Sequence, residues 1–211
     1  MLRHSIPDLE LRTKLEERGW ECHLLLQADG QTNFAFKYDL CCEFGDLLEA
    51  VYHRDVTFED LKYEWWGVVI GPPSGEPVAC ATLSFKSDAV SSFMTRFEAV
   101  HPSVQKTGVG RLLFDCLAVW ARFLVFNDES ARECVATTKG QFFLVACIDA
   151  DDAEDIDEED CKEAWDDNVY GHGKFLKKLG FIKAQHAFGQ VVKEIAFQRE
   201  FNVPTQEEEE A

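Results

Sequence analysis

Hydrophobic and polar residues follow two rhythms along this chain, and each rhythm predicts one kind of secondary structure. Apolar residues spaced three or four positions apart predict helices over residues 8–18, 43–55, 57–64, 108–126 and 168–181. Alternating or continuous apolar runs predict strands over residues 21–27, 91–102, 141–149 and 186–201, and a hairpin over 65–86. A Gly-Pro-Pro-Ser-Gly loop separates the two strands of that hairpin.

The order of these elements indicates how the sheet is built. Hairpin strands come first and a βαβα passage follows, so we expect a mixed sheet with helices on both faces, an α/β fold of the α+β layered kind. The helical crossovers of the second half require parallel pairing with right-handed connections. The run 141–149 is apolar almost throughout, which is typical of a strand buried on both faces. Ser5 or Asp8 is available to cap the first helix, and Gly180 is expected to end the last one.

The net charge of −18 is concentrated in two segments. Residues 149–160 contain nine acids and no bases, and Glu207 to Glu210 add four more carboxylates, so the rest of the chain is only mildly acidic. Both segments are typical of solvated chain, and both could also attract a cationic partner. We expect a single domain over 1–204 with an acidic insert at about 149–166, followed by an acidic disordered tail over 205–211. The insert lacks the Gly and the closing spacing of an EF-hand loop, so no metal is expected.

Composition argues against several classes of partner. No basic stripe is present to neutralise phosphates, so we do not expect a nucleic acid. No apolar run approaches the roughly 20 residues of a membrane span, and the charged N-terminal segment has no signal-peptide core. The eight cysteines form no CxxC pair, and Cys80, Cys116 and Cys147 fall inside apolar runs, which predicts reduced thiols and a cytoplasmic or nuclear location. The neighbours Cys41 and Cys42 are either strand-edge residues or a redox-active or metal-binding pair.

A glycine-containing turn, Gln-Lys-Thr-Gly-Val-Gly over residues 105–110, lies between the strand at 91–102 and the helix at 108–126. Gly108 and Gly110 allow the backbone to curl and a ligand to approach closely. The helix that begins there adds unpaired N–H groups and the positive end of its dipole, a combination that binds phosphate or pyrophosphate. The turn is neither a Walker loop nor a GxGxxG dinucleotide fingerprint, and taken by itself it favours an ordinary connection between strand and helix.

The sequence around this turn resembles the acyl-CoA-binding motif of the GNAT superfamily of N-acetyltransferases. VHPSVQKTGVGRLL, residues 100–113, is similar to the family's Gln/Arg-x-x-Gly-x-Gly/Ala turn, which follows a strand ending in Val-x-Pro and opens a Leu-rich helix. GKFLKKLGF, residues 173–181, is similar to the family's late helix, which ends Tyr-x-Lys-Leu-Gly-Phe. The resemblance covers roughly residues 68–201. It implies a GNAT-like mixed, mostly antiparallel central sheet, with acetyl-CoA as co-substrate and an amine as acetyl acceptor.

The resemblance also implies which residues bind the co-substrate. Backbone N–H groups of the turn and of the helix start are expected to cradle the CoA pyrophosphate; these residues are Gln105, Lys106, Thr107, Gly108, Val109, Gly110 and Arg111. The main chain of Val100 is expected to pair with the pantetheine arm, where the strands containing FEAV and FLVAC splay apart. Lys106 and Arg111 are the nearby cations, and each either pairs with CoA phosphates or is simply solvated.

Acetyl transfer to an amine requires a base for the amine proton and an acid for the leaving thiolate. The family's usual acid is the Tyr of Tyr-x-Lys-Leu-Gly-Phe, and this position is Leu176, which cannot donate a proton. Tyr170 and His172 lie one or two turns earlier on the same predicted helix and are the candidates to replace it. The best candidate for the base is Glu98, the ionisable acid that shares a strand face with Val100.

Other residues compete for the catalytic roles. The family's base usually lies one or two pleats before Glu98, at positions held here by Arg96 and Met94. We therefore expect Glu98 to act through a water, and the alternative is a structural ion pair with Arg96. Candidates of second rank are His101, His186, Asp149 and Glu194.

The sequence leaves the acceptor open among a protein N-terminus, a lysine, a polyamine and another small amine. The acid-rich segments favour a cationic acceptor by electrostatic steering. Two other functions remain open. One is a catalytically weak or inactive acyl-CoA-binding or regulatory module, which Leu176 favours, and the other is an acidic interaction protein in which the insert and tail bind a partner. Nothing in the sequence determines the oligomeric state.

Overall fold

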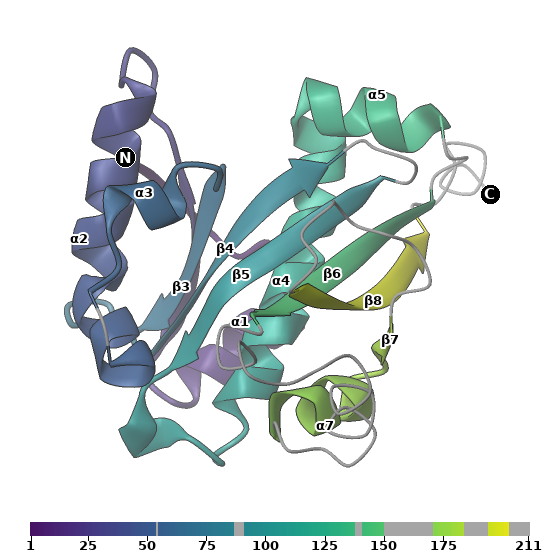
Figure 1. Ribbon diagram of the computed structural model, residues 1–211. Helices are drawn as coiled ribbons and strands as arrows, with labels where there is room; N and C mark the ends of the chain where they lie inside the picture. The colour runs from purple at the N-terminus through teal and green to yellow at the C-terminus, as the bar shows by residue number, and fades with distance from the viewer. Residues whose placement is uncertain (54, 87–90, 138–140, 150–170, 184–193, 203–211) are drawn as a thin grey trace, which may run out of the picture. The chain divides into compact units, whose positions relative to one another are not determined.

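A computed structural model describes residues 1–53, 55–86, 91–137, 141–149, 171–183 and 194–202 of the chain (Figure 1). These residues form two compact units. Unit 1 contains residues 1–85 and 97–132, and unit 2 contains the described residues of 86–96 and 133–211. Strand β5, Ser92–Val100, has its first half in unit 2 and its second half in unit 1.

Unit 1 is built on strands that are antiparallel to one another in chain order: β1 (Leu2–Ser5), β2 (Glu21–Leu26), β3 (Trp66–Gly71) and β4 (Ala79–Lys86). The predicted hairpin is β3–β4, in which Val69 lies opposite Cys80. The end of β5 follows beside β4, where the N–H of His101 donates to the carbonyl of Val78 at 2.9 Å. The hydrophobic pattern does not predict β1, because its residues are all exposed and show no alternation.

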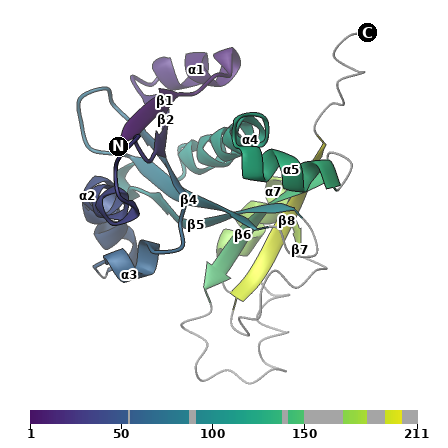
Figure 2. The ribbon, with the colours of Figure 1, turned by 90° about the horizontal axis from the view of Figure 1, so that it is seen from above.

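Helices cover both faces of these strands, as Figure 2 shows: α1 (Leu9–Glu16) and α4 (Val109–Asn127) on one face, α2 (Asn33–Tyr52) and α3 (Phe58–Leu61) on the other. On the α4 face, the indole N–H of Trp120 donates to the sulfur of Cys22 at 3.5 Å, and both residues are buried. On the α2 face, Phe36, Leu40 and Phe44 pack in one cluster with residues of β2, β3 and β4. Side chains alternate between the two faces of a strand, so a buried strand such as β2 contributes Cys22 to one face and Leu25 to the other.

Side-chain caps fix where the first two helices begin. Asp8 accepts the N–H of Leu11 at 2.8 Å, which confirms one of the two predicted caps of α1. Thr32 caps α2 in the same way. The predicted start of α2 at residue 43 is wrong, because the helix begins at Asn33. The polar residues around the buried Phe36 and Leu40 interrupt the apolar spacing that the prediction relied on.

In unit 2 the first half of β5 pairs in parallel with β6 (Gln141–Asp149), from Ser92 opposite Phe143 to Thr95 opposite Ala146. β6 is antiparallel to β8 (Glu194–Asn202), which is antiparallel to the short β7 (Ile182–Lys183). Phe142, Leu144, Val145 and Ala146 are all buried, which confirms that β6 is covered on both faces.

Helix α7 (Gly171–Lys178) ends at the predicted glycine. Gly180 has a φ of +84°, and the N–H groups of Phe181 and Gly180 donate to the carbonyls of Leu176 and Lys177 at 3.1 Å each. These two bonds define a Schellman motif, the helix ending that requires a left-handed residue.

The described strands follow the order β1-β2-β3-β4-β5-β6-β8-β7. This mixed, mostly antiparallel sheet, flanked by helices, confirms the predicted fold class. Helix α5 (Glu129–Thr137) and β7 are not predicted from the hydrophobic pattern, since both are short. The predicted acidic insert and tail fall mainly on residues 150–170 and 203–211, outside the described residues. No helix in the part of the chain that the structure describes is long and apolar enough to cross a membrane.

Candidate functional site

The glycine-containing turn connects β5 to α4 within unit 1. After Val100 comes a 3₁₀ turn over Pro102–Val104, and α4 begins at Val109. Lys106 and Gly108 both have left-handed backbone conformations, with φ of +63° and +91°. A non-glycine residue seldom adopts such a φ, so surrounding contacts hold the turn in this shape.

The turn presents main-chain N–H groups that the protein itself leaves unpaired. Among the described residues, none accepts a hydrogen bond from the N–H of Lys106, Gly108, Val109, Gly110 or Arg111. The last three begin α4, whose dipole places partial positive charge at the same end. Convergent N–H donors at a helix start are a suitable cradle for a phosphate or pyrophosphate.

Side chains of the turn fold back on the main chain and hold its shape. The amide of Gln105 donates to the carbonyl of Val100 at 3.1 Å, and the hydroxyl of Thr107 donates to the carbonyl of Val104 at 2.7 Å. The N–H of His101 bonds to the β4 side, so the N–H and carbonyl of Val100 point away from β4. The sequence does not reveal that Gln105 already occupies the Val100 carbonyl. The main-chain N–H of Val100 is the group left to pair with an added chain.

A cation that sequence reasoning missed lies against the turn. Nη1 of Arg18, two residues beyond α1, donates to the carbonyl of Thr107 at 3.1 Å. Arg111 is mostly exposed and lies 4.0 Å from Asp115, and Lys106 is exposed. Arg18 is 89 residues from its partner, and no sequence pattern links positions so far apart.

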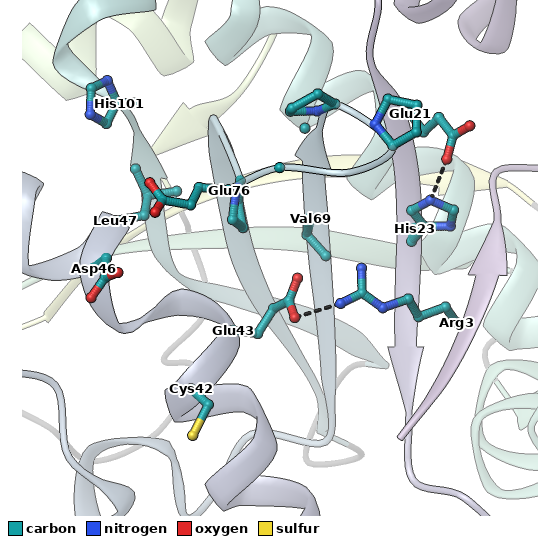
Figure 3. A pocket seen from close by; sticks show the side chains of 15 residues that line it. Arg3, Glu21, His23, Cys42, Glu43, Asp46, Leu47, Val69, Glu76 and His101 are labelled. Carbon is teal, nitrogen blue, oxygen red and sulfur yellow. Dashed lines mark hydrogen bonds and ion pairs between the residues drawn. The ribbon is translucent and has the colours of Figure 1, made fainter.

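Unit 1 also contains a pocket of about 620 Å³ (Figure 3). Its lining comes from β1, β2, α2, the β3–β4 hairpin and His101, the residue directly after β5. Leu47 and Val69 provide an apolar part of the wall, and prolines of the hairpin loop border it. The sequence gives no signal for this pocket, because segments far apart in the chain form it.

The charged groups of the pocket are mainly acidic. Arg3 pairs with Glu43 at 2.5 Å, and His23 lies 3.0 Å from the carboxylate of Glu21. Asp46 on α2 and Glu76 on the hairpin loop are exposed and have no cationic partner among the described residues (Figure 3). The pocket can therefore accept a small cation more readily than an anion.

The arrangement around β5 decides the type of fold. A parallel pair, β5–β6, lies in a mostly antiparallel sheet, and the glycine turn and α4 follow β5 directly. The chain has a GNAT-type fold. The parallel pairing of β5 with β6 runs from Ser92 opposite Phe143 to Thr95 opposite Ala146, within unit 2.

No family model matches the sequence, and no curated protein matches it either. Solved structures similar to the chain include the ribosomal-protein-S18-alanine N-acetyltransferase from Escherichia coli, with 12% identity over 78% of this chain and 88% of that one and a TM-score of 0.42. An aminoglycoside 6′-N-acetyltransferase complexed with coenzyme A is 16% identical over 79% and 93%, with a TM-score of 0.44. Escherichia coli ElaA is 12% identical over 85% and 97%, with a TM-score of 0.41. Likeness at these identities concerns the fold alone.

Glu98, the predicted base, lies just beyond a break in β5. Phe97 has a φ of +52°, which interrupts the regular strand directly before Glu98. Glu98 is half-buried, and its main-chain carbonyl accepts the hydroxyl of Tyr52 at 3.1 Å. Its carboxylate is close enough to Cys80 to add to the raised pKa of that thiol, which is caused first by burial. Phe97 and Ala99 pack in the α2-face core, which also contains Cys80.

One of the two candidate acids lies in a described helix. His172 lies in α7, at the second residue of the helix. Leu176, which holds the position of the family tyrosine, is fully buried in the same helix. Asp149 and Glu194 lie opposite each other at one end of the β6–β8 pair. Tyr170 and His186 lie outside the described residues.

Cys22, Cys41, Cys42, Cys80 and Cys116 are free thiols. Cys41 and Cys42 lie on α2, so their prediction as strand-edge residues is wrong; the misplaced start of α2 explains the error. Burial raises the pKa of the Cys41 thiol, with a contribution from Cys42. Cys80 and Cys116 are buried free thiols, as predicted. Within the described ranges, no three His, Cys, Asp or Glu side chains are grouped so that they could hold a metal ion.

Proposed function

We propose that this protein is an acyl-CoA-dependent N-acetyltransferase that moves an acetyl group from acetyl-CoA to a primary amine by direct transfer in a ternary complex. The observation that carries the proposal is the turn before α4. Its left-handed residues 106 and 108 present unpaired N–H groups at a helix start, directly after a strand whose last residue, Val100, points its N–H away from β4. This combination suits a ligand with a pyrophosphate joined to an extended, hydrogen-bonding arm.

In this proposal the turn residues Gln105 to Arg111 hold the pyrophosphate, chiefly through main-chain N–H groups. Gln105 also has a positioning role, because its side chain fixes the Val100 carbonyl. The Val100 N–H pairs with an amide carbonyl of the pantetheine arm. Acetyl-CoA supplies the reactive thioester, and the chain supplies its position beside the amine, which can account for much of the acceleration.

The reaction needs one proton removed and one delivered. The amine nitrogen attacks the thioester carbonyl, the C–N bond forms and the C–S bond breaks. In this proposal Glu98 accepts the proton of the amine through a water. The leaving thiolate takes a proton from His172 or Tyr170, and these two alternatives remain open.

We further propose that the acceptor is cationic. Asp46 and Glu76 give the unit 1 pocket uncompensated negative charge, and His101 links its wall to the turn. A distal ammonium group of a polyamine or basic peptide fits this charge, and a neutral amine gains nothing from it.

The first experiment measures CoA release from acetyl-CoA with a panel of polyamines, neutral primary amines and basic peptides. Gly108→Glu is the test variant, because it forces a side chain onto a φ of +91° and places a carboxylate beside the N–H groups. Gly30→Glu is the matched control. Gly30 has a φ of +75° and open space around its Cβ position, so the strain is the same but the site is not involved.

Amine-dependent CoA release by the wild type and Gly30→Glu, but not by Gly108→Glu, is the expected result. Saturable CoA binding without release by any acceptor would instead establish the acyl-CoA-binding module, in which Leu176 has ended acid catalysis. Absence of both binding and release would refute the proposal.

A further inference from the structure

Arg18 brings a positive charge to the turn from a segment that precedes the GNAT-like core. One of its two terminal nitrogens, Nη1, donates to the carbonyl of Thr107 at 3.1 Å. The other, Nη2, lies 3.7 Å from the position that a Cβ atom would occupy on Gly108. The guanidinium therefore lies against the two residues that precede the first turn of α4.

The end of α1 fixes the position of Arg18. Gly19 has a φ of +71°, and the N–H groups of Trp20 and Gly19 donate to the carbonyls of Leu15 and Glu16 at 3.0 and 2.9 Å, which is a Schellman motif. Leu15 is buried and anchors the last turn of α1 in the core of unit 1. The Trp20 ring lies 5.6 Å from the guanidinium carbon, a distance that suits a cation–π contact. A helix ending and an aromatic ring thus hold a flexible side chain in one place.

Arg18 has no carboxylate partner among the described residues, although the chain has a net charge of −18. Two other cations of unit 1 have carboxylate partners: Lys14 pairs with Glu10 at 2.5 Å, and Arg3 pairs with Glu43. A guanidinium carries five N–H donors, and Thr107 uses one of them. The remaining donors lie beside main-chain N–H groups that are themselves unpaired. An anion at the turn would be the natural acceptor for both sets.

We propose that Arg18 is a binding residue for the pyrophosphate of CoA, acting together with the main-chain N–H groups of the turn. The inference rests on the proposed function and deepens it. Arg18 contributes to the affinity for CoA and takes no part in the chemical step, because it contacts the turn and not the thioester end. Its effect should appear in the KM for acetyl-CoA and leave kcat unchanged.

Calorimetric titration of CoA, dephospho-CoA and pantetheine at several salt concentrations tests this assignment. Arg18→Gln removes the charge but keeps an N–H donor for Thr107, and Arg18→Lys keeps the charge but loses the planar fork. Lys14→Gln is the matched control, since it removes the same charge from α1 without contact to the turn. We expect Arg18→Gln to weaken CoA and dephospho-CoA alike by about tenfold or more. Arg18→Lys should be intermediate, and Lys14→Gln should remain within about twofold of wild type.

A purely structural role for Arg18 predicts a different salt dependence. If Arg18 touches phosphate, Arg18→Gln flattens the dependence of the CoA dissociation constant on salt; if it only shapes the turn, the slope stays as in wild type. Equal CoA binding by Arg18→Gln and wild type would overturn the inference and leave the proposed function intact. A loss seen with CoA but not with dephospho-CoA would place the contact at the 3′-phosphate, and an equal loss with pantetheine would show a structural role. Wild type that binds no CoA would refute the proposed function itself.

Discussion

The two segments that resemble GNAT motifs differ in the groups that they make available to a ligand. In residues 100–111 the groups available to a ligand are main-chain N–H groups, held in place by left-handed residues 106 and 108. In residues 173–181 the group expected to act is a side chain, and its position is occupied by Leu176, which is fully buried. The first segment retains the arrangement that the proposed chemistry needs, and the second retains only a helix and its Schellman ending.

This difference shows how unequally the two kinds of site depend on residue identity. A main-chain site requires only that the backbone curls, which a few glycines and one strained lysine achieve. A side-chain acid requires one residue type at one position, and a single substitution removes it. Affinity for CoA and the rate of acetyl transfer should therefore respond to separate sets of mutations.

The largest effect is expected at Glu98, the side chain that we propose accepts the amine proton. Glu98→Gln keeps the shape but cannot accept the amine proton, so kcat should fall by about 10²-fold or more while the KM for acetyl-CoA is unchanged. Steady-state kinetics over a range of pH measures both. Glu49→Gln, an exposed glutamate on α2, is the control and should behave as wild type. Unchanged kcat in Glu98→Gln would move the base to another residue.

The next effect is expected at Leu176 in α7. Changing it to tyrosine tests whether this position can donate a proton, as the tyrosine of the resembled motif does. Leu176→Tyr puts a larger polar side chain into a site that is fully buried, so we expect a loss of about 1–3 kcal/mol in the free energy of unfolding and no gain in turnover. Chemical denaturation measures the free energy of unfolding, and CoA-release assays measure turnover. Leu176→Met should cost less, because it conserves volume. A faster enzyme of normal stability would show that this position faces the reacting atoms.

A smaller effect is expected from the pocket of unit 1. The double change Asp46→Asn with Glu76→Gln removes its uncompensated charge and should raise the KM for a cationic acceptor by about twofold to tenfold. The KM values for acetyl-CoA and for a neutral amine should stay the same, and they serve as internal controls. Added salt should reduce the difference between variant and wild type. An equal change for both amines would show that the pocket does not recognise charge.

The smallest effect is expected from Lys37→Met, which removes a charged side chain from the core and should change how the free energy of unfolding depends on pH. Lys37 is buried, and this burial lowers its pKa below the ordinary 10.5, while Glu64 opposes the shift. Between the lowered pKa and 10.5 the unfolded chain binds more protons than the folded one, so the free energy of unfolding rises with pH in this window. Urea unfolding at several alkaline pH values should show a smaller rise for Lys37→Met than for wild type. Lys62→Met, a change at an exposed lysine, should leave the increase in the free energy of unfolding with pH as in wild type. If Lys62→Met reduced this increase as much as Lys37→Met, the net charge of the chain, and not the burial of Lys37, would be the cause.

Much of the fold follows from local signals in the sequence. Helical spacing and alternation locate most helices and strands, and Asp8 and Gly180 mark helix ends because capping depends on neighbours within a few residues. The start of α2 could not be located, since Lys37 interrupts its apolar pattern yet is buried through contacts that the sequence does not reveal. β1 pairs with β2, but all four of its residues are exposed, so the sequence shows no alternation that would predict it.

The sequence by itself determined the glycine turn, its place between a strand and a helix, and the substitution of the family tyrosine by Leu176. Each depends on residue types within a short stretch of chain. Only the tertiary structure decided that Arg18 reaches Thr107, that Gln105 occupies the Val100 carbonyl, and that α2 and the β3–β4 hairpin enclose an acidic pocket. These features join groups brought together by packing, and the packing of the whole unit sets their distances.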